Sequence, residues 1–254
     1  MKTTERFSDR VANYVKYRPG YPAEVTEQLR ALGLLKAGAL IADIGSGTGI
    51  SSQLFLDADC EVSGIEPNRE MREAGEKMLA AYPRFHSIAA SAEATTLPDA
   101  SVDLVVAGQA FHWFDAEKAK AEFRRILKPG GSVVLIWNDR RTDSTDFLKA
   151  YEDLLKMFGT DYTKVNHKNL DENIFNAFWG AGNWNMFSVE NFQDFTFEEL
   201  KGRLFSSSYV PPEDHGDSPF MVSVLKKIFL RYQEPVTGGK VRFEYDTKVY
   251  YGTI

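Results

Sequence analysis

The class of fold is indicated by the segment Asp43-Ile44-Gly45-Ser46-Gly47-Thr48-Gly49. It follows a short apolar run at residues 39–44 and precedes a stretch with helical spacing at residues 49–57. Glycine allows the backbone to adopt a positive φ and lets a ligand approach closely, and the first turn of a helix leaves backbone N–H groups without partners. A glycine loop between a strand and a helix therefore predicts a ligand-binding turn at the edge of a sheet.

The spacing of these glycines distinguishes between two kinds of ligand. A dinucleotide-binding turn has the pattern G-x-G-x-x-G, whereas the third glycine here comes one residue early, at Gly49, and position 50 is isoleucine. Asp43 precedes the glycines, and a carboxylate suits a cationic or hydroxyl-bearing ligand better than a pyrophosphate. The spacing thus disfavours a nicotinamide oxidoreductase. A tight turn that binds nothing is the structural alternative.

Strand and helix patterns alternate around this loop. Strands are predicted at residues 39–44, 61–66, 85–90, 103–108 and 132–138, and helices at residues 49–57, 69–82 and 116–127. This alternation predicts a Rossmann-like α/β fold, in which a parallel sheet carries helices on both faces. Residues 189–195 and 240–251 read as two further strands. We expect a single domain over residues 1–254, with a helical N-terminal arm at about 1–33 and a helical cap insertion at about 140–187.

The composition excludes several classes of protein. The chain has 254 residues and a formal net charge of −6, which argues against a general nucleic-acid binder, because phosphate contacts need clustered lysine and arginine. The single cysteine, Cys60, excludes an intramolecular disulfide, and the four histidines share no ligand spacing, so we predict no metal. The apolar runs are too short to span a membrane and the first residues are polar, so we expect a cytoplasmic protein without membrane contact. The sequence leaves the oligomeric state open.

Three residues at the end of the second predicted strand and just after it extend the ligand site. Glu66 lies seventeen residues after Gly49, and an acid at that place can accept hydrogen bonds from both hydroxyls of a ribose. A solvent-facing acid that caps the next helix is the alternative. Pro67 and Met71 could form a wall against one face of an adenine, although a methionine at helical spacing also fits a protein core.

Five motifs, at residues 43–49, 65–68, 90–93, 105–114 and 127–131, occur in the order found in one large enzyme family. With them the chain resembles the class I S-adenosylmethionine-dependent methyltransferases. The N-terminal residues up to Pro22 and the run at 109–114 are similar to the branch known as methyltransferase type 11, which includes trans-aconitate methyltransferase-like proteins. The resemblance implies a seven-stranded, mostly parallel sheet with an antiparallel last strand. It also implies S-adenosyl-L-methionine as cofactor and a small-molecule acceptor, for which a carboxylic acid is one candidate.

The resemblance further implies which residues contact the cofactor. Those implied for its methionine part are Asp43, Gly45, Gly47, Gly49 and Gln109. Those implied for its ribose and adenine are Glu66, Pro67, Met71, Ser91, Ala92 and Glu93. Ser91 departs from the family pattern, since many relatives carry aspartate there. Tyr14 and Arg18 are either a lid over the cofactor or a packing residue and a surface charge.

Four residues that follow predicted strands are candidates for the acceptor site, namely His112, Trp113, Arg140 and Arg141. His112 is either a general base or part of the pocket wall, and Trp113 offers an apolar wall. Either arginine could bind an acceptor carboxylate or remain a solvated charge. Two other functions stay open: methylation of RNA or protein, and binding of S-adenosylmethionine without turnover.

Overall fold

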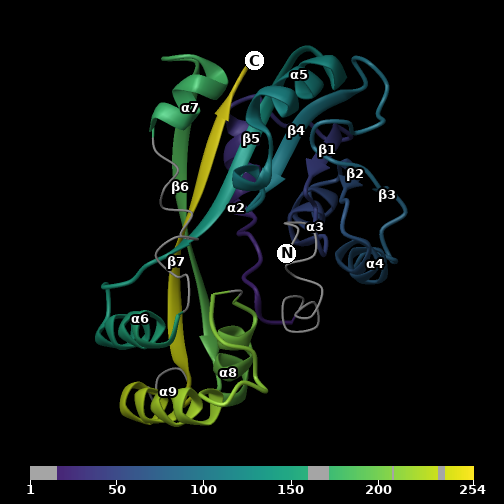
Figure 1. The fold of residues 1–254 in the computed structure, drawn as a ribbon. Coiled ribbons are helices and arrows are strands. Elements are labelled where there is room, and N and C mark those ends of the chain that lie inside the picture. The colour runs from purple at the N-terminus through teal and green to yellow at the C-terminus, as the bar shows by residue number, and fades with distance from the viewer. Residues whose placement is uncertain (1–15, 160–171, 208, 234–237) are drawn as a thin grey trace.

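The computed structural model describes residues 16–159, 172–207, 209–233 and 238–254. Its framework is a seven-stranded sheet in the order β3-β2-β1-β4-β5-β7-β6 (Figure 1). The strands are β1 (Leu40–Ile44), β2 (Glu61–Ile65), β3 (Phe85–Ile88), β4 (Val102–Gly108), β5 (Leu127–Arg140), β6 (Trp184–Phe195) and β7 (Val241–Gly252). The first five strands pair in parallel, whereas β7 runs antiparallel to both of its neighbours, β5 and β6. The predicted sheet with its antiparallel last strand is confirmed.

Helices cover both faces of this sheet. They include α2 (Glu24–Ala31), α3 (Ile50–Asp57), α4 (Arg69–Met78), α5 (Ala116–Ile126) and α7 (Glu172–Trp179). Successive side chains of a strand point to opposite faces, so Leu135 of β5 joins the core beneath α5 and α7, while Ile136 joins the core beneath α2 and α3. Within the described parts of the chain, no helix is long and apolar enough to cross a membrane.

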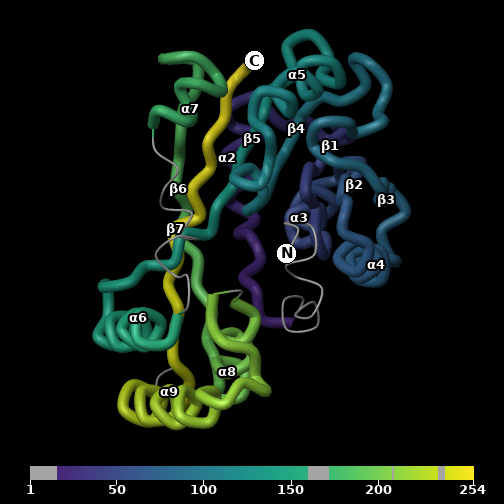
Figure 2. The backbone as a smooth tube through the Cα atoms, in the orientation of Figure 1, coloured from purple at the N-terminus to yellow at the C-terminus, as the bar shows by residue number. Residues whose placement is uncertain are grey.

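A third core lies at the end of the sheet where β5 finishes. The long strands β6 and β7 continue past this end and carry α6 (Asp146–Phe158), α8 (Phe197–Phe205) and α9 (Ser218–Tyr232), which gather there in Figures 1 and 2. Apolar side chains of the three helices pack around Phe195 of β6 and Phe243 of β7. We call these three helices, with the strand ends between them, the cap. The cap stands at the carboxyl edge of the sheet, on the side where ligands bind in such folds.

The cap is assembled differently from the predicted insertion at 140–187. Of the two helices that the structure describes in that range, α6 belongs to the cap, but α7 packs on the sheet. The cap also includes α8 and α9, which lie in the connection between β6 and β7. Strand β6 begins at Trp184 rather than at residue 189, because Trp184 already pairs with Gly252 of β7. Of the predicted N-terminal arm, residues 1–15 lie outside the described residues.

Several local signals in the sequence produce the expected structure. The Asn68 side chain caps α4 by accepting the N–H of Met71 at 2.9 Å. Thr196 and Glu199 form a capping box at the start of α8. Helix α5 ends at Ile126, one residue before its predicted end, because Leu127 already pairs with Val102 and so opens β5. Such signals act within a few residues, so the sequence reveals them directly.

The cap core gives a prediction about stability. Phe243 is fully buried, and its ring centroid lies 4.7 Å from that of Tyr151 and 5.2 Å from that of Phe195. Replacing Phe243 by Ala leaves a cavity, so we expect a loss of about 3–5 kcal/mol in the free energy of unfolding, measured by urea denaturation. Phe192→Ala, at a site that is 57% exposed, is the control and should cost less than about 1 kcal/mol. A Phe243→Ala protein as stable as the control would show that this core does not stabilise the fold.

Candidate functional site

The glycine loop connects β1 to α3 in the conformation that its sequence predicts. Gly45, Gly47 and Gly49 have φ values of 67°, 56° and 88°, a region that residues with side chains rarely adopt. The N–H groups of Gly45 and Ser46 both donate to the carbonyl oxygen of Ile65, at 2.8 and 3.1 Å. The loop is therefore held against the end of β2 by its own backbone.

Glu66 strengthens this attachment from the other side. Its Oε2 accepts the N–H of Gly47 at 2.9 Å, and its Oε1 accepts the N–H of Asn68 at 2.7 Å. Burial raises the pKa of the Glu66 carboxyl, and the two backbone hydrogen bonds oppose that rise. Each carboxylate oxygen keeps a further lone pair. Glu66 can thus hold the loop and still accept hydrogen bonds from hydroxyl groups of a ligand.

A pocket opens beside the loop, at the carboxyl ends of β1, β2 and β4. Its lining residues are Gly45, Gly47, Glu66, Pro67, Asn68, Met71, Ser91, Ala92, Glu93, Gly108, Gln109, Ala110, Trp113 and Phe114. All of them except Asn68, Gly108, Ala110 and Phe114 are predicted site residues. These segments meet because parallel strands end at the same edge of a sheet.

The four additional lining residues lie inside motifs that the sequence analysis recognised, but their side chains carry no distinctive chemistry. Ala110 illustrates their role. A Cβ atom on Gly45 would lie 2.6 Å from the Cβ of Ala110, so this part of the wall needs small residues. Only the three-dimensional contact reveals such a constraint, because Gly45 and Ala110 lie far apart in the sequence.

Gln109 follows β4 with a strained backbone. Its φ is +57°, and a residue with a side chain is held in that region only when its surroundings fix it, often at a functional site. The N–H of Gln109 donates to the carbonyl of Ile136 at 2.9 Å, and its Nε2 donates to the carbonyl of Asn138 at 3.3 Å. Gln109 thereby connects the pocket to the end of β5.

Asp43 lies beneath the glycine loop and is fully buried. Its Oδ2 accepts hydrogen bonds from the hydroxyls of Ser51 and Ser52, at 2.7 and 2.6 Å, and its Oδ1 has no hydrogen-bond partner among the described residues. Burial raises the pKa of Asp43 to about 6, and the two serine hydroxyls act against that rise. The Asp43 carboxylate lies close to the loop, but it does not line the pocket.

Several predicted cofactor and catalytic residues lie outside the pocket lining. A Cβ atom on Gly49 would lie 2.7 Å from Leu79 Cδ1, so this glycine packs against the end of α4. The Nη2 of Arg18 donates to the carbonyl of Ser206 in the cap at 3.0 Å. The His112 ring lies beside the Trp113 ring, with centroids 4.6 Å apart. Tyr14 falls outside the described residues.

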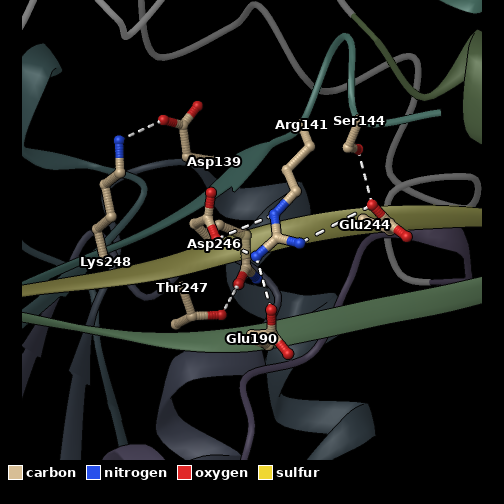
Figure 3. Close-up of polar contacts among 9 residues, drawn as sticks. Asp139, Arg141, Ser144, Glu190, Glu244, Asp246, Thr247 and Lys248 are labelled. Atoms are coloured by element: carbon tan, nitrogen blue, oxygen red, sulfur yellow. Dashed lines mark hydrogen bonds and ion pairs between the residues drawn. The ribbon is translucent and has the colours of Figure 1, made fainter.

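The side chains of the two predicted acceptor arginines, Arg140 and Arg141, point to opposite faces of the sheet, and neither lines the pocket. Alternation along β5 places Arg140 on the face that leads to the cap core, where its Nη2 lies 2.5 Å from Glu152 Oε2. Arg141 turns to the other face and contacts Asp246 at 2.7 Å and Glu190 at 2.9 Å (Figure 3). Neighbouring residues of an extended strand cannot share a face, so Arg140 and Arg141 have different surroundings.

The buried Asp43 gives the stability a definite pH dependence. An acid whose pKa is raised on folding, here from 3.8 to about 6, stabilises the fold when protonated, and this contribution is lost as the pH rises through 6. The shift corresponds to about 3 kcal/mol. Asp43→Asn keeps an oxygen for the serine hydroxyls but cannot ionise.

Between about pH 4 and about pH 8, the wild-type free energy of unfolding should therefore fall by about 3 kcal/mol more than that of Asp43→Asn. Urea denaturation across this range measures both proteins. Parallel pH profiles would show that Asp43 titrates as it does in an unfolded chain.

Comparison with known proteins points to one family. Residues 42–135 match the model of the type 11 methyltransferase domain. An uncharacterized methyltransferase of Schizosaccharomyces pombe is 32% identical over 205 residues, which cover 80% of this chain and 72% of that protein. An uncharacterized methyltransferase of Mycobacterium tuberculosis is 35% identical over 134 residues, so the match spans about half of either protein, 53% of this chain and 52% of the relative.

Solved structures share the fold at lower identity. A candidate type II methyltransferase from Anaeromyxobacter dehalogenans has a TM-score of 0.69 and 22% identity, and the match covers 93% of this chain and 98% of that one. A phosphoethanolamine N-methyltransferase of Haemonchus contortus, solved with S-adenosylhomocysteine, has a TM-score of 0.54 and 16% identity over 98% of this chain and 58% of that one. With its glycine loop, its acid after β2 and its matching relatives, the chain belongs to the class I S-adenosylmethionine-dependent methyltransferases.

Proposed function

We propose that this methyltransferase acts on a small molecule enclosed between the pocket and the cap. The observation that carries the proposal is the position of the cap, which stands at the same edge of the sheet as the pocket (Figure 1). A site enclosed in this way fits a small acceptor better than a folded macromolecule. The trans-aconitate methyltransferase-like branch remains our proposal for the subfamily, since its motif at 109–114 contributes four residues to the pocket wall.

The pocket residues fit the cofactor part by part. Glu66 would accept the ribose hydroxyls, Gly45 and Gly47 would border the methionine part, and Asp43 beneath them would attract its amino group. The adenine would lie among Pro67, Met71, Ser91, Ala92 and Glu93. When bound, S-adenosylmethionine supplies an activated methyl group. The protein must then align the acceptor and exclude water, and it needs a base only for an acceptor that is protonated at neutral pH.

Methyl transfer from radiolabelled S-adenosylmethionine tests the acceptor class directly. The protein is incubated with a low-molecular-mass cell extract, with total RNA, or with denatured and native protein. We expect label in the low-molecular-mass products. Label in RNA, with an affinity that falls steeply as salt is raised, would replace this proposal with an RNA methyltransferase. Cofactor binding without labelled product in any fraction would favour a module without turnover.

Two glycines, Gly47 in the glycine loop and Gly38 outside it, give a matched pair of variants. A side chain at Gly47 would point to within 3.3 Å of Met71 Cε in the pocket, whereas a side chain at Gly38 meets nothing within 4 Å. Both glycines have positive φ, 56° and 72°, so the backbone strain of a valine is comparable. Gly47→Val should abolish binding of S-adenosylhomocysteine in calorimetry, and Gly38→Val should leave it intact. Equal affinities would show that the loop is only a turn.

Substitution of His112 tests whether methyl transfer needs this residue as a general base. Its ring packs beside Trp113, which lines the pocket, but His112 itself is outside the lining. This position favours a role in supporting the wall over a role as general base. His112→Ala should then lower kcat by less than about tenfold, whereas loss of a general base costs about 10²–10⁴-fold. The pH profile of kcat is the second readout, and it should keep its form in His112→Gln. A fall of the larger size, with a limb missing from the profile, would assign the base to His112.

A further inference from the structure

Arg203 of α8 is a buried charged group that has no carboxylate partner among the described residues. It is 5% exposed, and its Nη1 donates to the hydroxyls of Ser206 and Ser207, at 3.3 and 3.1 Å. Its Nε has no hydrogen-bond partner, and no acid among the described residues forms an ion pair with it. A guanidinium stays protonated in proteins, and an uncompensated buried charge is costly. The two serine hydroxyls accept hydrogen bonds from its Nη1 but do not neutralise its charge.

Two more arginines converge on the same place. Arg18 donates to the carbonyl of Ser206 at 3.0 Å, on the residue whose hydroxyl contacts Arg203. Arg140 and Arg203 lie over the same Phe243 ring, with guanidinium carbons 5.9 and 6.0 Å from its centroid. Glu152 compensates the charge of Arg140. The cap therefore holds a positive cluster, Arg18, Arg140 and Arg203, and the part of the chain that the structure describes places no anion against Arg203.

The pKa of the neighbouring Tyr209 responds to these positive charges. Burial by itself raises the pKa of the phenol, but the charges of Arg203, Arg18 and Arg140 outweigh burial and bring the pKa below its usual value. All three guanidinium groups thus act on one point in the cap. An anion placed there would be stabilised by the same field.

A hydrogen-bonded chain runs from the pocket wall to residues that lie two positions from Arg18 and from Arg140. Gln109 of the pocket wall donates to the carbonyl of Asn138, and the Nδ2 of Asn138 donates to the carbonyl of Gly20 at 3.1 Å. Arg140 lies two residues after Asn138 on the same face of β5, and Arg18 lies two residues before Gly20. A ligand that reaches the cluster from the pocket would pass along this short polar connection.

We propose that Arg203, with Arg18 and Arg140, forms an oxyanion-binding subsite that holds a carboxylate of the acceptor. A guanidinium presents two parallel N–H groups to a carboxylate, so the unpaired Nε edge of Arg203 matches this group in shape and in charge. This subsite takes over the carboxylate-binding role that the sequence suggested for Arg141, whose charge is already compensated by Asp246 and Glu190. The inference rests on the proposed small-molecule function and assigns the residue that would select an acidic acceptor.

Calorimetry on the complex with S-adenosylhomocysteine tests the subsite. The probes are acetate, succinate, citrate and benzoate, each compared with its neutral amide. We expect at least one acid to bind the wild-type protein and its amide to bind far more weakly. Arg203→Gln should lower the affinity for that acid at least about tenfold, while the affinity for S-adenosylhomocysteine stays unchanged.

Two further arginine variants remove the same charge elsewhere. Arg242→Gln, at a surface pair with Asp194, is the control and should bind the acid as the wild type does. Arg141→Gln should also bind normally. Loss of acid binding in Arg141→Gln and not in Arg203→Gln would overturn the inference and place the acid on the opposite face of β5.

Hydrogen exchange on the wild-type protein keeps the test independent of the variant's folding. In the presence of the acid, amides at 199–207 should exchange more slowly than with S-adenosylhomocysteine alone. Protection confined to other segments, unchanged acid binding by a folded Arg203→Gln protein, or a wild type that binds S-adenosylhomocysteine but none of the acids would each overturn the subsite. A wild type that binds no S-adenosylhomocysteine would instead contradict the proposed function itself.

Discussion

The rest of the structure depends on the antiparallel pairing of β7 between β5 and β6. β7 pairs with β5 from Gly252 to Tyr245, but it pairs with β6 along its whole length, down to Val241. Residues 241–244 of β7 are therefore paired with β6 alone, and this two-stranded ribbon continues beyond the carboxyl edge of the sheet (Figure 2). The ribbon carries Phe243 into the cap core. One strand thus belongs both to the sheet that forms the pocket and to the cap that stands over it.

Alternation at the end of β5 divides the polar groups between two faces. On one face, Asn138 contacts Gly20, and Arg140 enters the cap core. On the other face, Asp139 pairs with Lys248 at 2.7 Å, and Arg141 meets the acids of β6 and β7 (Figure 3). The first face connects the N-terminal segment, the pocket and the cap. The second is a network of ion pairs that joins the three strands and has no link to the pocket among the described contacts.

Two buried charges of opposite sign lie at this edge, and serine hydroxyls contact both. Asp43 accepts from Ser51 and Ser52, and Arg203 donates to Ser206 and Ser207. Hydroxyls can stabilise either charge by hydrogen bonding, but neutralisation needs an opposite charge. A methyltransferase brings its cofactor together with an acceptor. A negative group beneath the glycine loop suits a cationic amino group, and a positive group in the cap suits an anion.

The sequence by itself determined the sheet, the glycine loop and most of the pocket wall, because their signals are local. Apolar runs of strand length, glycines between a strand and a helix, and an acid at the end of a strand each describe a few consecutive residues. Parallel pairing then brings them to one edge without further information. The N-terminal ends of α4 and α8 were predictable for the same reason, since a cap residue and its partner lie three positions apart.

Only the tertiary structure decided the cap, the extra length of β6 and the environment of the arginines. Residues 184–188 become strand because β7 supplies partners sixty or more positions away. Arg140 and Arg141 are adjacent in the sequence, yet strand alternation gives them different surroundings. Arg203 resembles any other helical arginine in the sequence, and it is buried because the folded chain brings distant residues against it, Phe243 of β7 among them. Burial and charge pairing depend on contacts between distant segments, and these contacts exist only once the chain has folded.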